Sequence, residues 1–172
     1  MTEDGLRIAL HVTARITFAF FVCAFTGNAL RDLCPGKLSL WLSRNRDWFL
    51  VAMAASHTFH LAAIIVFFQT VGWSKLHLVT LLGGGSVYLL IYALAATAIM
   101  RLRRGGHGFL AGSPRLEAAA LYLIWLIFAL AFVPRIVSGW PVYSILAVTA
   151  LAALAIRIAC LARHKRSLAT AA

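Results

Sequence analysis

Acidic residues are scarce in this sequence: five of its 172 residues are Asp or Glu, whereas 16 are Lys or Arg. Glu117 is the one acid near the body of an apolar run, and Asp47 lies at the end of another. Paired carboxylates for general acid–base catalysis are therefore lacking. The motifs HExxH and GxSxG are absent, and the glycine run at residues 83–85 precedes no lysine. These absences argue against a hydrolase or a nucleotide-dependent enzyme.

Cysteine is also scarce, with Cys23, Cys34 and Cys160 as its only occurrences. The number is odd, and no CxxC spacing is present, which argues against a disulfide framework or a zinc site. We therefore interpret the three cysteines as small apolar side chains that fill space.

Apolar residues dominate the remainder, at 62% of the sequence with a mean hydropathy of +0.88. A soluble domain of this length could not hide so much apolar surface from water, whereas a bilayer acts as its solvent. The net charge of +11 lies in short basic clusters between apolar runs, and no basic platform with interleaved aromatics is present, so we expect no nucleic-acid partner. The sequence predicts one integral membrane domain over residues 1–172, with the lipid bilayer as its surroundings.

Five apolar runs are long enough to cross a bilayer core of about 30 Å, which takes about 20 helical residues. They cover residues 6–30, 48–70, 77–100, 116–133 and 141–162. The runs are continuous rather than alternating, and only a helix satisfies its own backbone in lipid, so the fold class is an all-α five-span bundle. Gly83, Gly84 and Gly85 in the third run favour close approach of another helix, although they are also a weak point for that helix.

Basic residues predict the orientation. Twelve lie in the first loop, the third loop and the C-terminal tail: Arg31, Lys37, Arg44, Arg46, Arg101, Arg103, Arg104, Arg115, Arg157, Arg163, Lys165 and Arg166. Three lie on the other side: Arg7, Lys75 and Arg135. The positive-inside rule then places the N-terminus outside and the C-terminus in the cytoplasm of a bacterial inner membrane. The acidic start of the chain is unlike a secretory signal, so we expect the first run to remain as an uncleaved span.

Ionisable side chains within spans are costly and are usually retained for function. His11 and Arg15 share one face of the first span, and His57 and His60 share one face of the second. With His77 and Arg135 at outer helix ends, these groups are expected to converge on the outer half of the membrane. Imidazole ligates haem iron, and arginine pairs with haem propionates. The alternative is that these histidines only form hydrogen bonds between helices.

The stretch from Arg46 to Ala52, followed by Ser56-His57-Thr58-Phe59-His60-Leu61, resembles the ferric reductase-like transmembrane family. Weaker matches extend over roughly residues 5–160. They are Arg15 with the Phe18 to Phe25 run, the glycine run with Leu94 to Thr97, and Leu116 to Phe128 with Pro134-Arg135. The resemblance implies haem b, with His60 as the axial ligand of the haem iron and His57 as a second ligand or an orienting neighbour.

One position departs from that family, whose fourth helix usually begins with a haem-ligating histidine. Glu117 occupies the position here, and the fourth span contains no histidine. The second ligand is then expected to be His11, His77 or none, with Arg15 and Arg135 available for propionates. No flavin or nicotinamide domain follows the spans, so electron transfer would require a separate membrane partner.

Two other functions remain open. The chain is alternatively a haem-free accessory or structural subunit of a larger respiratory or photosynthetic membrane complex, with Glu117 an interfacial acid paired to Arg115 or Arg104. A small transporter or an enzyme acting on a lipid is the third possibility. Internal repeats and broken helices would favour a transporter, and no clear repeat is found.

Overall fold

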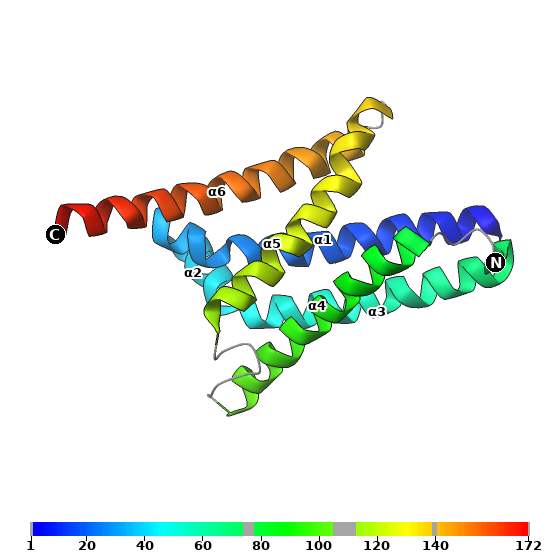
Figure 1. Ribbon diagram of the computed structural model, residues 1–172, viewed down its shortest axis with the longest axis horizontal. Coiled ribbons are helices and arrows are strands. Elements are labelled where there is room, and N and C mark those ends of the chain that lie inside the picture. The colour runs from blue at the N-terminus through cyan, green and yellow to red at the C-terminus, as the bar shows by residue number, and fades with distance from the viewer. Residues whose placement is uncertain (1, 74–77, 105–112, 139–140, 172) are drawn as a thin grey trace. The chain divides into compact units, whose positions relative to one another are not determined.

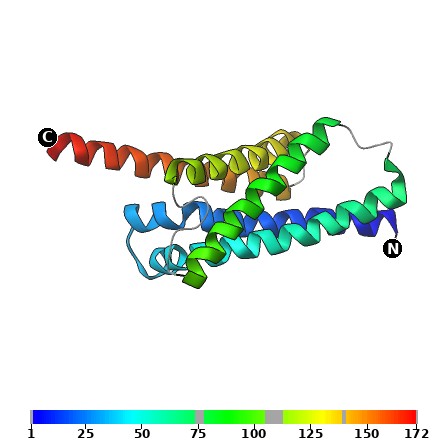
Figure 2. The ribbon, with the colours of Figure 1, turned by 60° about the horizontal axis from the view of Figure 1, so that its bottom comes forward.

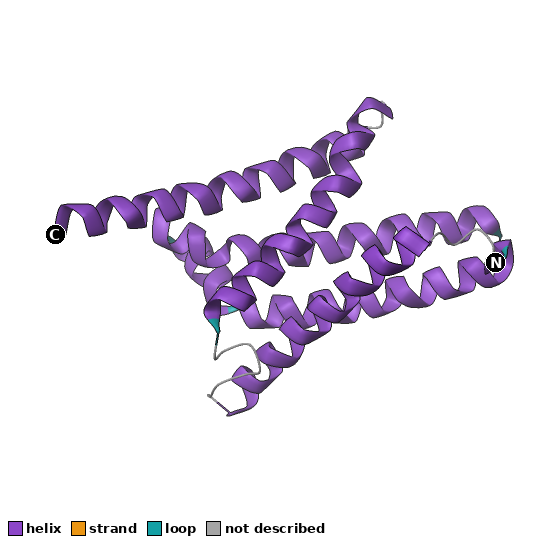
Figure 3. Cartoon of the chain, viewed as in Figure 1, coloured by secondary structure: helices purple, strands orange, loops and turns teal. Residues whose placement is uncertain are grey.

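The computed structural model describes residues 2–73, 78–104, 113–138 and 141–171, and every regular element in these ranges is helical (Figure 1, Figure 3). The elements are α1 (Glu3–Leu33), α2 (Lys37–Arg44), α3 (Arg46–Val71), α4 (Leu78–Arg104), α5 (Pro114–Phe132), the 3-10 helix η2 (Val133–Ser138) and α6 (Pro141–Ala171). Five helices, α1 and α3 to α6, are long and apolar enough to cross a membrane. The predicted all-helical, five-span character is confirmed.

The ends of the helices follow local chemistry. The N–H of Gly5 donates to the Thr2 hydroxyl, so Thr2 caps the start of α1, where Glu3 and Asp4 face the positive end of the helix dipole. Proline begins both α5 and α6, where its missing N–H costs nothing. Gly72, with a φ of 94°, closes α3 in the left-handed conformation that glycine adopts without strain.

The sequence predicts no helix between the first two spans, yet the structure has α2 there. At eight residues, α2 is too short to cross a bilayer. Its start is fixed by Ser39, whose hydroxyl accepts from the N–H of Gly36 (2.9 Å) and donates to the carbonyl of Cys34 (2.8 Å). Span-length reasoning cannot detect such an element, because it searches for long apolar runs.

Two compact units make up the chain. The first unit comprises Met1–Phe21 and Asp47–Ala120, and therefore holds the N-terminal part of α1, α3 except its first residue, all of α4, and the start of α5. Figures 1 and 2 both show α3 lying along the N-terminal part of α1. The buried apolar side chains of the first unit include Phe18, Phe21, Leu50, Met53, Ile91 and Leu94.

The second unit comprises Val22–Arg46 and Leu121–Ala172. Here the Trp125 indole N–H of α5 donates to the carbonyl of Ala150 in α6 (2.8 Å), and Ala147, Ala150 and Ala153 of α6 are buried. Trp125 therefore packs against a neighbouring helix. Small residues allow such close approach between membrane helices.

Arg157, counted with the C-terminal tail in the sequence, lies within the apolar part of α6. Its guanidinium lies over the rings of Phe25 (4.9 Å) and Tyr122 (5.2 Å), and Nη1 donates to the Phe25 carbonyl (3.4 Å). Two aromatic faces therefore stabilise this cation within an apolar helix.

Close helix approach occurs at a different glycine from those expected. A Cβ added at Gly84 or Gly85 would meet no described atom within 4 Å, so no described helix of this chain packs against these two residues. A Cβ at Gly27 would instead lie 3.1 Å from the backbone of Leu42, because α2 folds back onto the end of α1. The Ser43 hydroxyl, which donates to Asn28 Oδ1 (2.8 Å), holds the same contact.

Candidate intramembrane histidine site

His57 and His60 lie on one face of α3, as their three-residue spacing predicts. Their rings stack, with centroids 5.4 Å apart and planes 23° apart. The His57 side chain is buried, whereas His60 is only partly buried. The two imidazoles are therefore neighbours within the first unit rather than lipid-facing side chains on opposite faces.

The tautomer of His60 follows from its hydrogen bond to α1. Its Nδ1 lies 2.8 Å from the hydroxyl oxygen of Thr13, which in turn lies 2.7 Å from the carbonyl oxygen of Ala9. A carbonyl has no hydrogen, so the threonine proton points to Ala9 and the hydroxyl accepts from His60. This arrangement favours the tautomer with the proton on Nδ1, which leaves the lone pair of the neutral ring on Nε2.

A second polar contact lies one turn away along both helices, where the hydroxyls of Thr17 and Ser56 are 2.9 Å apart. Pairing Thr13 with His60 and Thr17 with Ser56 means that α1 and α3 run antiparallel, as consecutive spans must. Direct contacts of this length leave no space for a porphyrin between the two helices at this level. A haem sandwiched between His11 of α1 and His60 of α3 therefore does not fit.

Tyr88 of α4 lies beside His57, with ring centroids 4.1 Å apart. The Nδ1 atom of His57 and the hydroxyl of Tyr88 are both buried, and neither has a hydrogen-bond partner among the described residues. One turn further along α4, the Tyr92 hydroxyl lies 3.0 Å from that of Thr58. Buried polar atoms without partners are uncommon because each costs free energy, so this pair is suited to receiving a small polar group from outside the chain.

The other predicted site residues are distributed differently. His11 is exposed on α1 and interacts electrostatically with His60, and Arg15, one turn later, is partly buried. Arg135 belongs to the second unit, where it donates to the Ala131 carbonyl and lies over the Tyr143 ring at 5.9 Å. His77 lies outside the described residues. The structure thus brings His57 and His60 into direct contact, and His11 within electrostatic range.

These residues suit a haem held by a single protein ligand. Two axial ligands must approach iron from opposite faces, and His57 and His60 rise from one turn of one helix with their rings stacked. His60 Nε2 has the lone pair that a ligand needs, and a hydrogen bond from the other ring nitrogen is what usually orients a metal-binding histidine. No set of three His, Cys, Asp or Glu side chains in the described ranges is arranged to hold a metal ion.

At the other end of the first unit, Arg101 of α4 joins two acids. Its Nε donates to Asp47 Oδ2 (3.0 Å) at the start of α3, and its Nη1 donates to Glu117 Oε2 (2.9 Å) at the start of α5. The predicted partners of Glu117 were Arg115 and Arg104; the structure gives it Arg101. The network holds the start of α3, the end of α4 and the start of α5 together.

Several functional side chains escape prediction from sequence. Thr13, Ser56 and Tyr88 complete the histidine site, yet hydroxyl residues are common in membrane helices, where they bond to their own backbone. The one available signal is the four-residue spacing of Thr13 and Thr17, which places both on the face that meets α3.

The chain is a multi-pass helical membrane protein with a polar histidine cluster inside its first unit. Comparison with protein-family models, curated proteins and solved structures gave no match. Function is therefore inferred from the residues of the two units themselves.

Proposed function

We propose that this protein is a haem b electron-transfer subunit of a bacterial inner membrane, working with a separate membrane partner. His60 is the axial ligand, and bound haem supplies one-electron chemistry. The observation that carries the proposal is the Thr13–His60 hydrogen bond, which presents Nε2 as a lone-pair donor on a partly accessible ring. A neutral, oriented imidazole is the form that ligates haem iron.

His57 is an orienting neighbour in this proposal. Its ring stacks on that of His60 and limits the rotation of the ligand about its side-chain bonds. His57 Nδ1 and the Tyr88 hydroxyl are polar atoms that a bound group can satisfy, which lowers the cost of keeping them buried. With His11 excluded by the contact between α1 and α3, a second protein ligand for the haem iron would be His77 or none. Arg15 lies at the level of these histidines along α1 but two residues from both Thr13 and Thr17, and therefore on another face of the helix; Arg15 and Arg135 are the arginines proposed for the propionates.

The proposed orientation has the N-terminus outside and the C-terminus in the cytoplasm. The Asp47–Arg101–Glu117 network supports a common side for the start of α3, the end of α4 and the start of α5. That side bears the basic residues of the first and third loops, which the positive-inside rule assigns to the cytoplasm.

A haem-free accessory subunit of a larger respiratory or photosynthetic membrane complex is the second candidate. The observation favouring it is that Thr13 with His60 and Thr17 with Ser56 already satisfy one another between α1 and α3. In this function the histidines stabilise the helix pair, and the partner complex carries all redox chemistry.

A visible difference spectrum separates the two candidates. The protein is expressed with haem supplied, purified in mild detergent, and recorded as reduced minus oxidised. We expect a sharp b-type band that is lost in His60→Ala and shifted but retained in His57→Ala. His164→Ala, which alters an exposed histidine of the second unit, is the matched control and should leave the band unchanged. A colourless, folded wild-type protein would refute the haem proposal, and its co-purification with a redox complex would support the second candidate.

A further inference from the structure

Charge is distributed very unevenly in the second unit. It holds nine basic residues and a single acid, Asp32. Seven of the basic residues lie at the end formed by the last turns of α1, by α2, and by the C-terminal part of α6: Arg31, Lys37, Arg44, Arg46, Arg163, Lys165 and Arg166. We call this region the basic end. Asp32 pairs with Arg31, and one carboxylate cannot neutralise seven cations.

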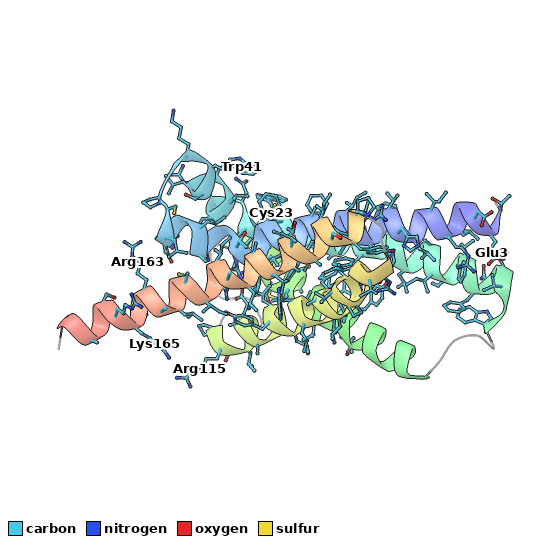
Figure 4. The ribbon with its side chains drawn as sticks, turned by 90° about the horizontal axis from the view of Figure 1, so that it is seen from above. Glu3, Cys23, Trp41, Arg115, Arg163 and Lys165 are labelled. Carbon is cyan, nitrogen blue, oxygen red and sulfur yellow. The ribbon has the colours of Figure 1, made fainter. Side chains whose placement is uncertain are left out.

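The basic end also carries exposed apolar side chains. On α2, Leu38 and Trp41 are 69% and 53% exposed, and the cations Lys37 and Arg44 lie on the same short helix. Tryptophan prefers the level of lipid headgroups, where its ring is dry and its N–H is wet. A short helix with this composition is suited to lying in the plane of the interface. Figure 4 shows Trp41 and Arg163 at the same end of the second unit.

A cavity of about 320 Å³ lies between α2 and the last turn of α1. Leu30, Leu38 and Leu42 form its apolar wall, and Lys37 lines it as the one cation. This volume is at the lower end of the range for ligand pockets. It therefore suits part of an acyl chain, with Lys37 available to the phosphate attached to that chain.

Side chains that can donate hydrogen bonds to a phosphate also line a second cavity, of about 330 Å³, at the same end. It is lined by Arg163, His164 and Ser167 of α6, together with Asp32 of α1. Arg163 Nη1 donates to the carbonyls of Asp32 and Leu33 (both 3.1 Å), which ties α6 to the end of α1 and fixes the guanidinium there. A guanidinium held in this way keeps further N–H donors for phosphate oxygens.

We propose that the basic end of the second unit binds an anionic phospholipid. Its phosphate is held by the cations of α2 and α6, and its acyl chain lies against the leucine wall beside α2. The apolar wall and the interfacial tryptophan distinguish this ligand from a soluble phosphate, which would require only the cations. The sign of the charge is complementary to the anionic leaflet that attracts basic clusters next to spans.

Native mass spectrometry of the full chain tests the proposal. The protein is reconstituted in nanodiscs of phosphatidylcholine with phosphatidylglycerol, released, and scored for retained lipid. We expect phosphatidylglycerol to be retained preferentially. The double variant Lys37→Ala/Arg44→Ala should lower its affinity roughly 25-fold, because each basic residue contributes about a fivefold factor near an anionic surface. Arg135→Ala, which removes a cation of the second unit that lies outside the basic end, should change it little.

Three results would overturn the proposal. The first is equal retention of both lipids by the wild-type protein, a measurement that does not depend on any variant folding. The second is an equal loss of selectivity in Arg135→Ala and in the double variant. The third is displacement of phosphatidylglycerol by glycerol phosphate added at the same concentration, which would indicate a soluble phosphate as the ligand. Leu38→Ser, which alters the leucine wall and leaves every charge in place, should weaken the lipid and not glycerol phosphate.

Discussion

The Nδ1 atom of His60 and the hydroxyl oxygen of Thr13 lie 2.8 Å apart, and they join α3 to α1. The hydroxyl proton is directed to the carbonyl of Ala9, so the imidazole must be the donor in the bond between the helices. One contact therefore has two consequences. It stabilises a helix pair in a medium without water, and it leaves Nε2 of His60 as a lone-pair donor.

Replacing Thr13 by valine removes the acceptor of this bond while keeping the shape of the side chain. We expect Thr13→Val to lower the free energy of unfolding by about 1 kcal/mol, since hydrogen bonds between membrane helices contribute about 0.6 kcal/mol on average and up to about 1.7. Thr70→Val is the matched control, because the Thr70 hydroxyl bonds to its own helix at Val66. Denaturation in mixed micelles, followed by circular dichroism, measures both variants.

A double-mutant cycle with His60→Ala isolates the pair. If the hydrogen bond is the cause, adding Thr13→Val to His60→Ala should cost almost nothing further. Equal effects of Thr13→Val in the two backgrounds would show that the threonine acts through its own helix instead.

The ion network at the other end of the first unit makes Arg101 a sensitive position. Asp47 and Glu117 are mostly buried, with 22% and 11% of their side chains exposed, and both bond to its guanidinium. We expect Arg101→Gln to destabilise the protein by about 2–4 kcal/mol, because two mostly buried carboxylates then lose the guanidinium that bonds to both. Arg103 lies two residues further along α4 and is exposed, so Arg103→Gln should cost less than about 0.5 kcal/mol.

The triple variant Arg101→Gln/Asp47→Asn/Glu117→Gln distinguishes charge from packing. Neutralising all three residues removes the two mostly buried negative charges together with their cation, so thermal unfolding should recover much of the stability lost in Arg101→Gln. No recovery would mean that the arginine acts mainly by filling space.

Two glycines should respond to alanine in opposite directions. Gly27→Ala places a Cβ 3.1 Å from the backbone of Leu42, so α2 must shift, at a cost of about 1–3 kcal/mol. Gly85→Ala meets open space in a helix and should be neutral or stabilising by up to about 1 kcal/mol. Thermal unfolding of the two variants decides the matter, and destabilisation by Gly85→Ala would show that another surface covers this part of α4.

The spans could be predicted because bilayer thickness dictates a long apolar run, and composition reports it directly. The third-span glycines show where this reasoning fails. A sequence shows that a residue is small, but only the fold shows whether another helix approaches it. In this fold the close approach is that of α2 to Gly27. The partners of Arg101 could not be predicted for a similar reason, since residues at three helix ends come together only after the helices pack. Thr13 is hardest of all, because its side chain resembles many others that bond to their own backbone.

The native cysteines allow the proposed orientation to be tested directly. Cys34 is exposed beside α2, whereas Cys23 and Cys160 lie within spans and are only partly exposed. If the N-terminus is outside, a membrane-impermeant maleimide should label Cys34 in inverted vesicles and not in intact spheroplasts. Asp4→Cys in a Cys34→Ser background presents a thiol at the opposite end of α1 and should show the reverse pattern. Labelling of Cys34 from outside the cell would invert the proposed orientation, and would place the basic end of the second unit in the outer leaflet.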